Sequence, residues 1–164
     1  MFDLTTFTII HTALSVIALL LGLVSIGGLL GGKSVSAVDV PYLLTSVATS
    51  VTGFGFPFVK FLPSHAVGIL SLIALAVAIY ARSGGRLAHW GRSYAVSITI
   101  SVYFLVFVSV AQSFSKVDVL RAAAPTLAEP PFTLVQGGVL ILFVLLGIGA
   151  ARIFPRAPLL ARPA

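Results

Sequence analysis

The chain has 164 residues, of which 59% are hydrophobic and only 9% are charged, and its formal net charge is +6 at pH 7. A soluble domain carries about 25% charged residues, so this composition excludes a globule that is covered by water on all sides. The Lys and Arg residues stand singly between long apolar runs and form no basic stripe, which argues against nucleic acid as a partner. The sequence therefore predicts an all-α, polytopic transmembrane helical bundle whose partner is the lipid bilayer.

Five apolar runs are long enough to cross a bilayer, which takes about 20 residues of helix. The predicted spans are residues 4–32, 42–60, 64–82, 92–115 and 131–152. They use nearly the whole chain, so we expect a single membrane domain over residues 1–164. An alternative has four spans and a re-entrant 42–60 segment, because Gly53, Gly55 and Pro57 weaken its end.

The first span ends in closely spaced glycines. Small residues four positions apart let two helices approach closely in a membrane. We therefore expect a helix-packing face at Gly27, Gly28, Gly31 and Gly32. No basic region precedes the apolar run, which is about twice as long as that of a signal peptide, so we expect this span to be retained.

The second and fourth spans carry polar residues at helical spacing. The two stripes are Thr45, Thr49 and Thr52, and Ser93, Ser97, Ser101, Ser109 and Gln112. Their hydroxyls can return to their own backbone or bridge to a neighbouring helix. Packing between helices is the favoured interpretation, and a lined pore is the alternative.

Residues 116–130 form the longest loop. The pattern of Val117, Leu120 and Ala124 predicts a short interfacial helix that lies on the membrane surface. The prolines that follow predict an extended chain that leads back into the last span. Proline is tolerated in the first turn of that helix.

With five spans, the basic residues divide unequally between the two sides of the membrane. Lys33, Arg82, Arg86, Arg92, Arg152, Arg156 and Arg162 fall on one side, and Lys60, Lys116 and Arg121 on the other. Short cytoplasmic loops are enriched in Lys and Arg. The sequence thus predicts an N-terminus outside and a C-terminus in the cytoplasm.

Four polar side chains share one depth in the outer half of the predicted bundle, roughly 9–12 Å from its midplane. They are His11, His65, Gln112 and Gln136, with Thr52 deeper on the second span. These five residues are the candidate cofactor-binding site. Imidazoles on separate helices can ligate the iron of haem b from both faces, which makes His11 and His65 candidate metal ligands. The same groups can instead hydrogen-bond the carbonyls of a quinone.

Each histidine also has a plain structural interpretation. Ser64 is a suitable N-cap, which would leave His65 at the wet interface as an ordinary helix start. A single interhelical hydrogen bond to Thr52, Gln112 or Gln136 would satisfy His11.

Several chemistries lack their residues in this chain. It has no Cys, which removes disulfides and thiolate chemistry. The carboxylates Asp3, Asp39, Asp118 and Glu129 all fall outside the predicted spans, which argues against a two-carboxylate site. No P-loop, nucleophile elbow or zinc-hydrolase motif is present. The sequence favours a role other than that of an enzyme.

The run Thr45–Phe58, TSVATSVTGFGFPF, is followed by Pro63–Gly68, PSHAVG, and later by Ala124–Phe132, APTLAEPPF. In these stretches the chain resembles a group of small hypothetical integral membrane proteins of proteobacteria. The resemblance implies a bacterial inner (cytoplasmic) membrane as the location and implies no particular activity.

Three functions stay open on the sequence. The first is a cofactor- or quinone-binding accessory module of a membrane redox complex, built on the His and Gln residues above. The second is a homo-oligomeric permease or channel for small molecules, lined by the two polar stripes. The third is a structural or assembly partner of a larger membrane complex, bound through the glycines of the first span.

Overall fold

The computed structural model describes residues 4–56, 63–83 and 86–154. The helices in chain order are α1 (Leu4–Leu30), α2 (Ser36–Gly53), α3 (Pro63–Arg82), α4 (Leu87–Lys116), α5 (Asp118–Ala123) and α6 (Pro130–Ile153). No strand occurs within these described ranges. The predicted all-α fold class is confirmed.

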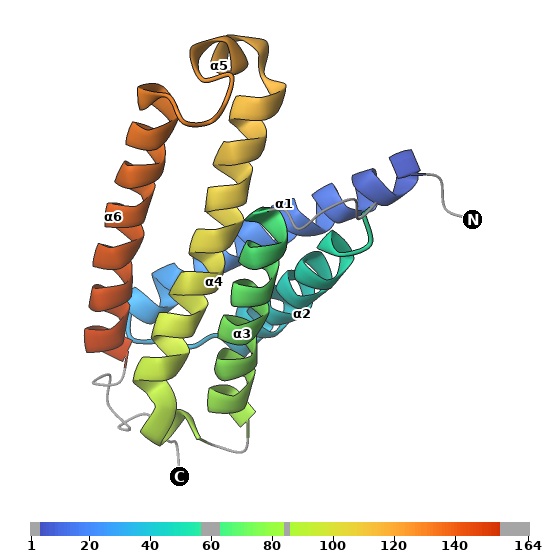
Figure 1. Cartoon of the computed structure of the whole chain (residues 1–164). Helices are drawn as coiled ribbons and strands as arrows, with labels where there is room; N and C mark the ends of the chain where they lie inside the picture. The colour runs from blue at the N-terminus through green and yellow to red at the C-terminus, as the bar shows by residue number, and fades with distance from the viewer. Residues whose placement is uncertain (1–3, 57–62, 84–85, 155–164) are drawn as a thin grey trace.

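Helix α4 is the centre of the bundle (Figure 1). Helices α3 and α6 pack along it, while α1 and α2 form an antiparallel pair that is tilted across the other three. The core lies where α1 to α4 meet, and Tyr42, Leu75, Tyr94, Ile98 and Val102 have no exposed surface there. This arrangement brings the end of α2 and the start of α3 to one end of the bundle, and the start of α2 and the end of α3 to the other.

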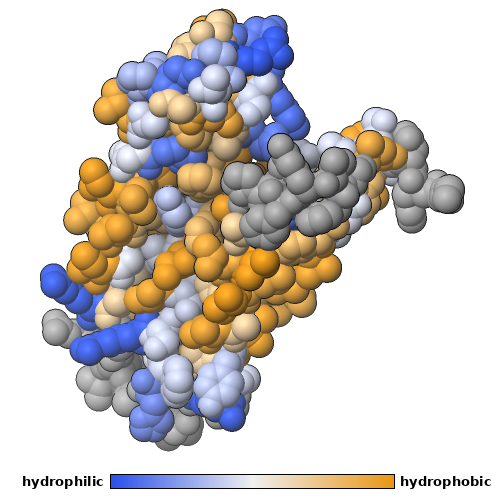
Figure 2. Space-filling model, viewed as in Figure 1, coloured by the Kyte–Doolittle hydropathy of each residue, from blue (hydrophilic) through white to orange (hydrophobic). Residues whose placement is uncertain are grey.

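Four of the helices are long and apolar enough to cross a membrane, namely α1, α3, α4 and α6. Helix α2 has 18 residues and is not among these four. Large apolar side chains such as Leu20, Leu134 and Ile141 are more than half exposed. Figure 2 shows such residues as a hydrophobic band between more polar ends. A surface of this kind suits contact with lipid rather than water, so the fold is compatible with an integral membrane helical bundle.

Helix α1 ends in a glycine cap. The Lys33 N–H donates to the Gly28 carbonyl oxygen at 2.8 Å and the Gly32 N–H to that of Leu29 at 3.0 Å. These two bonds form a Schellman motif, which needs a residue with positive φ after the helix. Gly32 fills that position at φ 71°. Its role here is to end α1 and turn the chain toward α2, because a side chain would cost about 1–2 kcal/mol in this conformation.

The connection from α4 to α6 contains the short helix α5, inside the 116–130 segment for which the sequence predicts one. Figure 1 shows α5 beyond the ends of α1, α2 and α3, above the long α4 and α6. That it lies on a membrane surface stays a prediction. In the loop before α6, the Thr126 hydroxyl donates to the Glu129 carboxylate at 2.7 Å. This hydrogen bond to the charged form lowers the pKa of Glu129 below its ordinary value.

Candidate functional site

His11 lies in the third turn of α1 and is bonded to α2. Its Nδ1 is 2.9 Å from Oγ1 of Thr52, so the predicted interhelical bond is made to Thr52. The Thr52 hydroxyl also lies 2.7 Å from the carbonyl oxygen of Ala48. A carbonyl has no proton to give, so the hydroxyl donates to it, and Oγ1 accepts from Nδ1–H. The other ring nitrogen, Nε2, has no hydrogen-bond partner among the described residues.

Aromatic rings lie against this pair. The Phe56 ring packs edge to face on the His11 ring, with centroids 5.2 Å apart, and on the Phe7 ring at 5.0 Å. Gly55 permits the approach, since a Cβ there would lie 2.7 Å from Cζ of Phe7. We call Phe7, His11, Thr52 and Phe56 the His11 cluster. It is an apolar, aromatic cluster in which one imidazole nitrogen makes no hydrogen bond to the described residues.

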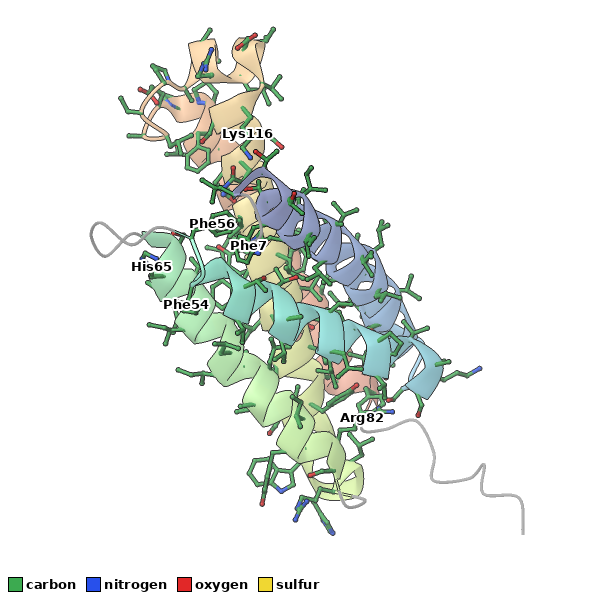
Figure 3. The ribbon with its side chains drawn as sticks, turned by 90° about the vertical axis from the view of Figure 1, so that its right-hand side faces the viewer. Phe7, Phe54, Phe56, His65, Arg82 and Lys116 are labelled. Atoms are coloured by element: carbon green, nitrogen blue, oxygen red, sulfur yellow. The ribbon has the colours of Figure 1, made fainter. Side chains whose placement is uncertain are left out.

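His65 lies in the first turn of α3 and is 7% exposed. It is therefore buried, and not at a wet interface as the helix-start interpretation has it. Its ring stacks on Phe54 with centroids 5.8 Å apart and an interplanar angle of 22°. The Phe54 ring lies close over Gly68, where a Cβ would be 3.1 Å away. Figure 3 shows Phe54 beside His65 on α3, and Phe56 beside Phe7 on α1, so the end of α2 connects both helices.

The two glutamines are not joined to the His11 cluster. Gln136 on α6 is buried, and its Nε2 donates to the Phe107 carbonyl oxygen of α4 at 3.0 Å. Its Oε1 is buried and has no hydrogen-bond partner in the described part of the chain. Gln112 on α4 is exposed. Of the five predicted site residues, the structure brings His11 and Thr52 into direct contact, and the glutamines belong to the α4–α6 side.

The polar stripes make contacts between helices. Oη of Tyr42 and Oγ of Ser101 lie 2.5 Å apart and link α2 to α4. Outside the stripes, the Ser50 hydroxyl donates to Ser71 at 3.2 Å and links α2 to α3. Oγ1 of Thr49 is buried and unpaired within the described residues. Thr52 and Ser101 thus make the interhelical contacts that the packing interpretation expects, whereas Ser109 and Gln112 are exposed.

The predicted glycine face is not where helices approach most closely. A Cβ on Gly27 would meet nothing within 4 Å, and one on Gly31 would meet only carbonyl oxygens of its own helix. A Cβ on Gly22 would lie 2.6 Å from Val102 and 2.7 Å from Tyr42. Gly22 is thus the point at which α1 crosses α2 and α4. No sequence pattern indicates this role for Gly22, because no second glycine accompanies it at helical spacing.

A second buried polar site, at the other end of the bundle, was also missed. Asp39 lies in the first turn of α2 and is only 2% exposed. The hydroxyls of Ser25 and Ser34 donate to its two oxygens at 2.7 and 2.6 Å. Nη1 of Arg82, at the end of α3, is 3.5 Å from Oδ2. The prediction placed Asp39 before the second span, whereas helix α2 begins at Ser36 and includes it.

Arg82 extends this cluster to further elements. Its Nη1 donates to Ser34 at 2.8 Å and its Nη2 to Ser36 at 2.7 Å, and Tyr94 of α4 lies 3.5 Å away. We call Asp39, Arg82 and the hydroxyls around them the Asp39–Arg82 cluster. It joins α1, α2, α3 and α4 at one end, far from Phe54 and His65 (Figure 3). No local sequence pattern predicts the Asp39–Arg82 cluster, because its members come from distant parts of the chain.

Within the described ranges, no three His, Asp or Glu side chains gather to form a metal-ion site. No known protein family, curated protein or solved structure matches the chain.

Proposed function

We propose that the chain is an integral membrane protein that binds a quinone at the His11 cluster, as an accessory module of a membrane redox complex. The observation that supports this best is the His11–Thr52 pair. Nδ1 of His11 lies 2.9 Å from Oγ1 of Thr52, and Nε2 makes no hydrogen bond to the described residues, while the rings of Phe7 and Phe56 pack on the same side. Sites for small aromatic ligands typically combine apolar walls with a few polar groups that orient the ligand.

The same pair can serve both redox forms of a quinone. When Thr52 donates to Ala48, Nδ1 carries the imidazole proton and Nε2 accepts from the hydroxyl of a hydroquinone. When the Thr52 hydroxyl rotates and donates to Nδ1, the neutral ring carries its proton on Nε2. That N–H then donates to the carbonyl of the oxidised ring. This rotation of the Thr52 hydroxyl breaks its hydrogen bond to the Ala48 carbonyl, which contributes about 1 kcal/mol.

Haem b is the other cofactor that the two histidines suggest. A metal-ligating histidine usually donates its second N–H to an oxygen, as His11 does to Thr52. Ligation from both faces also needs the second imidazole to point at the same iron. The ring of His65 instead lies nearly parallel to that of Phe54 on the α3 side of the bundle. The arrangement therefore favours a quinone over a haem with two histidine ligands.

The His11→Ala variant is expected to bind a quinone five- to tenfold more weakly, because one hydrogen bond to the ligand, about 1 kcal/mol, is lost. Thr52→Val is also expected to weaken quinone binding, because it removes the hydrogen bond that orients the His11 ring. The measurement is a calorimetric titration of the detergent-solubilised protein with decylubiquinone. Lipids extracted with the protein are screened for native quinone in parallel.

His89→Ala is the matched control, since His89 is an exposed histidine at the other end of the bundle. Its affinity for decylubiquinone should equal that of the wild type. Equal affinity in His11→Ala would contradict the proposal, and so would a wild-type protein that neither binds nor retains quinone. A dithionite-reduced α-band that disappears in His11→Ala would identify haem b instead.

We also propose that α2 is a fifth membrane-crossing helix, with the N-terminus outside and the C-terminus in the cytoplasm. At 1.5 Å per residue its length is about 27 Å, close to the roughly 30 Å of a hydrocarbon core. One end of the bundle carries Lys33, Arg82, Arg86, Arg92 and Arg152, and the other carries Lys116 and Arg121. Lys60, Arg156 and Arg162 lie outside the described residues. The uneven basic charge supports this orientation, and the resemblance noted above supports a bacterial inner membrane.

Single cysteines test this topology, since the chain has none of its own. In intact spheroplasts, a membrane-impermeant maleimide is expected to label Ser64→Cys and Ser115→Cys. It is expected to label Val35→Cys, in the α1–α2 loop, only after permeabilisation. All three positions are exposed. If Ser64→Cys and Val35→Cys are labelled from the same side, α2 does not cross.

A further inference from the structure

An apolar groove of about 310 Å³ runs between α4 and α6. Val96, Ile100 and Tyr103 line it from α4, and Val144 and Ile148 from α6. Along α6 the lining extends from Leu140 to Ala151, which is about 16 Å at 1.5 Å per residue. One leaflet of a bilayer has a hydrocarbon thickness of about 15 Å. The groove thus has the length and the lining that suit one extended acyl chain.

Two arginines stand at one mouth of this groove. Arg92 precedes Val96 by four residues, and Arg152 follows Ile148 by four, so each continues the groove-lining face of its helix. Both are exposed, and neither has an ion pair or a hydrogen bond in the described part of the chain. Figure 2 shows hydrophilic side chains projecting beside the lower end of α6, below a hydrophobic surface.

The carboxylates of the described residues do not neutralise this mouth. Asp39 is bonded to Ser25, Ser34 and Arg82, and Asp118 pairs with Arg121 beyond the opposite end of α4. Glu129 is held by Thr126 in the loop that precedes α6. Two positive charges at the open end of an apolar groove are complementary to an anionic head group that carries a hydrocarbon chain.

We propose that the α4–α6 groove binds an anionic phospholipid, with one acyl chain between the two helices and the phosphate between Arg92 and Arg152. The site is separate from the His11 cluster and does not depend on quinone binding. The occupant is a lipid of the leaflet that faces the arginine-rich end of the bundle.

Native mass spectrometry of the detergent-solubilised chain, with added dioleoyl phosphatidylglycerol or dioleoyl phosphatidylcholine, tests the proposal. The wild type is expected to retain one phosphatidylglycerol in clear preference to phosphatidylcholine. A basic side chain near an anionic lipid surface contributes about fivefold in affinity. Arg92→Gln and Arg152→Gln should each lower the preference about fivefold, and the double variant about twentyfold. Gly147→Leu, which fills the groove beside Thr99, should lower the retention of both lipids.

Lys33→Gln is the matched control, because Lys33 is exposed at the same end of the bundle but does not line the groove. The Arg92→Lys variant keeps the positive charge and should retain the preference for phosphatidylglycerol. It therefore distinguishes loss of charge from a folding defect caused by substitution at this position. An unchanged lipid preference in the double arginine variant would overturn the proposal. An equal loss in Lys33→Gln would also overturn it, as would conversion of a dimer to a monomer by Gly147→Leu, since a second copy would then occupy the groove.

Discussion

Arg82→Leu is expected to lower the free energy of unfolding by about 3–5 kcal/mol. The reason is the Asp39 carboxylate, which is 2% exposed and would be left with only two serine hydroxyls as donors. Loss of one partner of a buried pair is costly because the other charge stays behind without compensation. Equilibrium unfolding in mixed detergent and dodecyl sulfate micelles, followed by circular dichroism, measures the change.

The chain supplies its own control in the exposed pair of Arg121 and Asp118, whose side chains are 61% and 85% exposed. Arg121→Leu should cost at most about 1 kcal/mol, as exposed pairs do. The double variant Asp39→Asn, Arg82→Leu should be more stable than Arg82→Leu alone, because its buried group is neutral. An Arg82→Leu protein as stable as Arg121→Leu would show that the Asp39–Arg82 cluster does not hold the four helices together.

Gly22→Ala is expected to destabilise the bundle by about 1–3 kcal/mol, the usual range for overpacking. The new Cβ would lie 2.6 Å from Cγ2 of Val102 and 2.7 Å from Cε2 of Tyr42. Neither neighbour yields easily, since valine is stiff at χ1 and the Tyr42 hydroxyl lies 2.5 Å from that of Ser101. Helix α1 must therefore move away from α2 and α4, which a lower thermal unfolding temperature in detergent would report.

Gly27→Ala is the matched control on the same helix, because a Cβ there meets nothing within 4 Å. It should be neutral or stabilising by up to about 1 kcal/mol, since alanine is the better helix former. The double variant Gly22→Ala, Val102→Ala should recover much of the lost stability by making room. Equal unfolding temperatures for Gly22→Ala and Gly27→Ala would show that close approach at Gly22 is unimportant.

The candidate site was only partly predictable from the sequence. That His11 needs an interhelical partner follows from a polar ring inside an apolar helix, and Thr52 was one of three possible partners. The packing of Phe7 and Phe56 around that pair could not be inferred, because it depends on how the end of α2 lies against α1. The hydrogen-bond partners of Asp39 could not be predicted from the sequence either, because Ser25 and Arg82 are 14 and 43 residues away from it.

The sequence by itself determined the all-helical class and the approximate extent of α1, α3 and α6, whose ends lie within two residues of the predicted ranges. The reason is local, because an apolar run in lipid must satisfy its own backbone hydrogen bonds, and a helix does so within the segment. Only the tertiary structure decided that Gly22 rather than Gly27 is the crossing point, and that Asp39 is a buried helical residue. Those outcomes depend on how each helix is rotated about its axis and how it is tilted against its neighbours. Both are set by many side-chain contacts at once, between segments far apart in the chain.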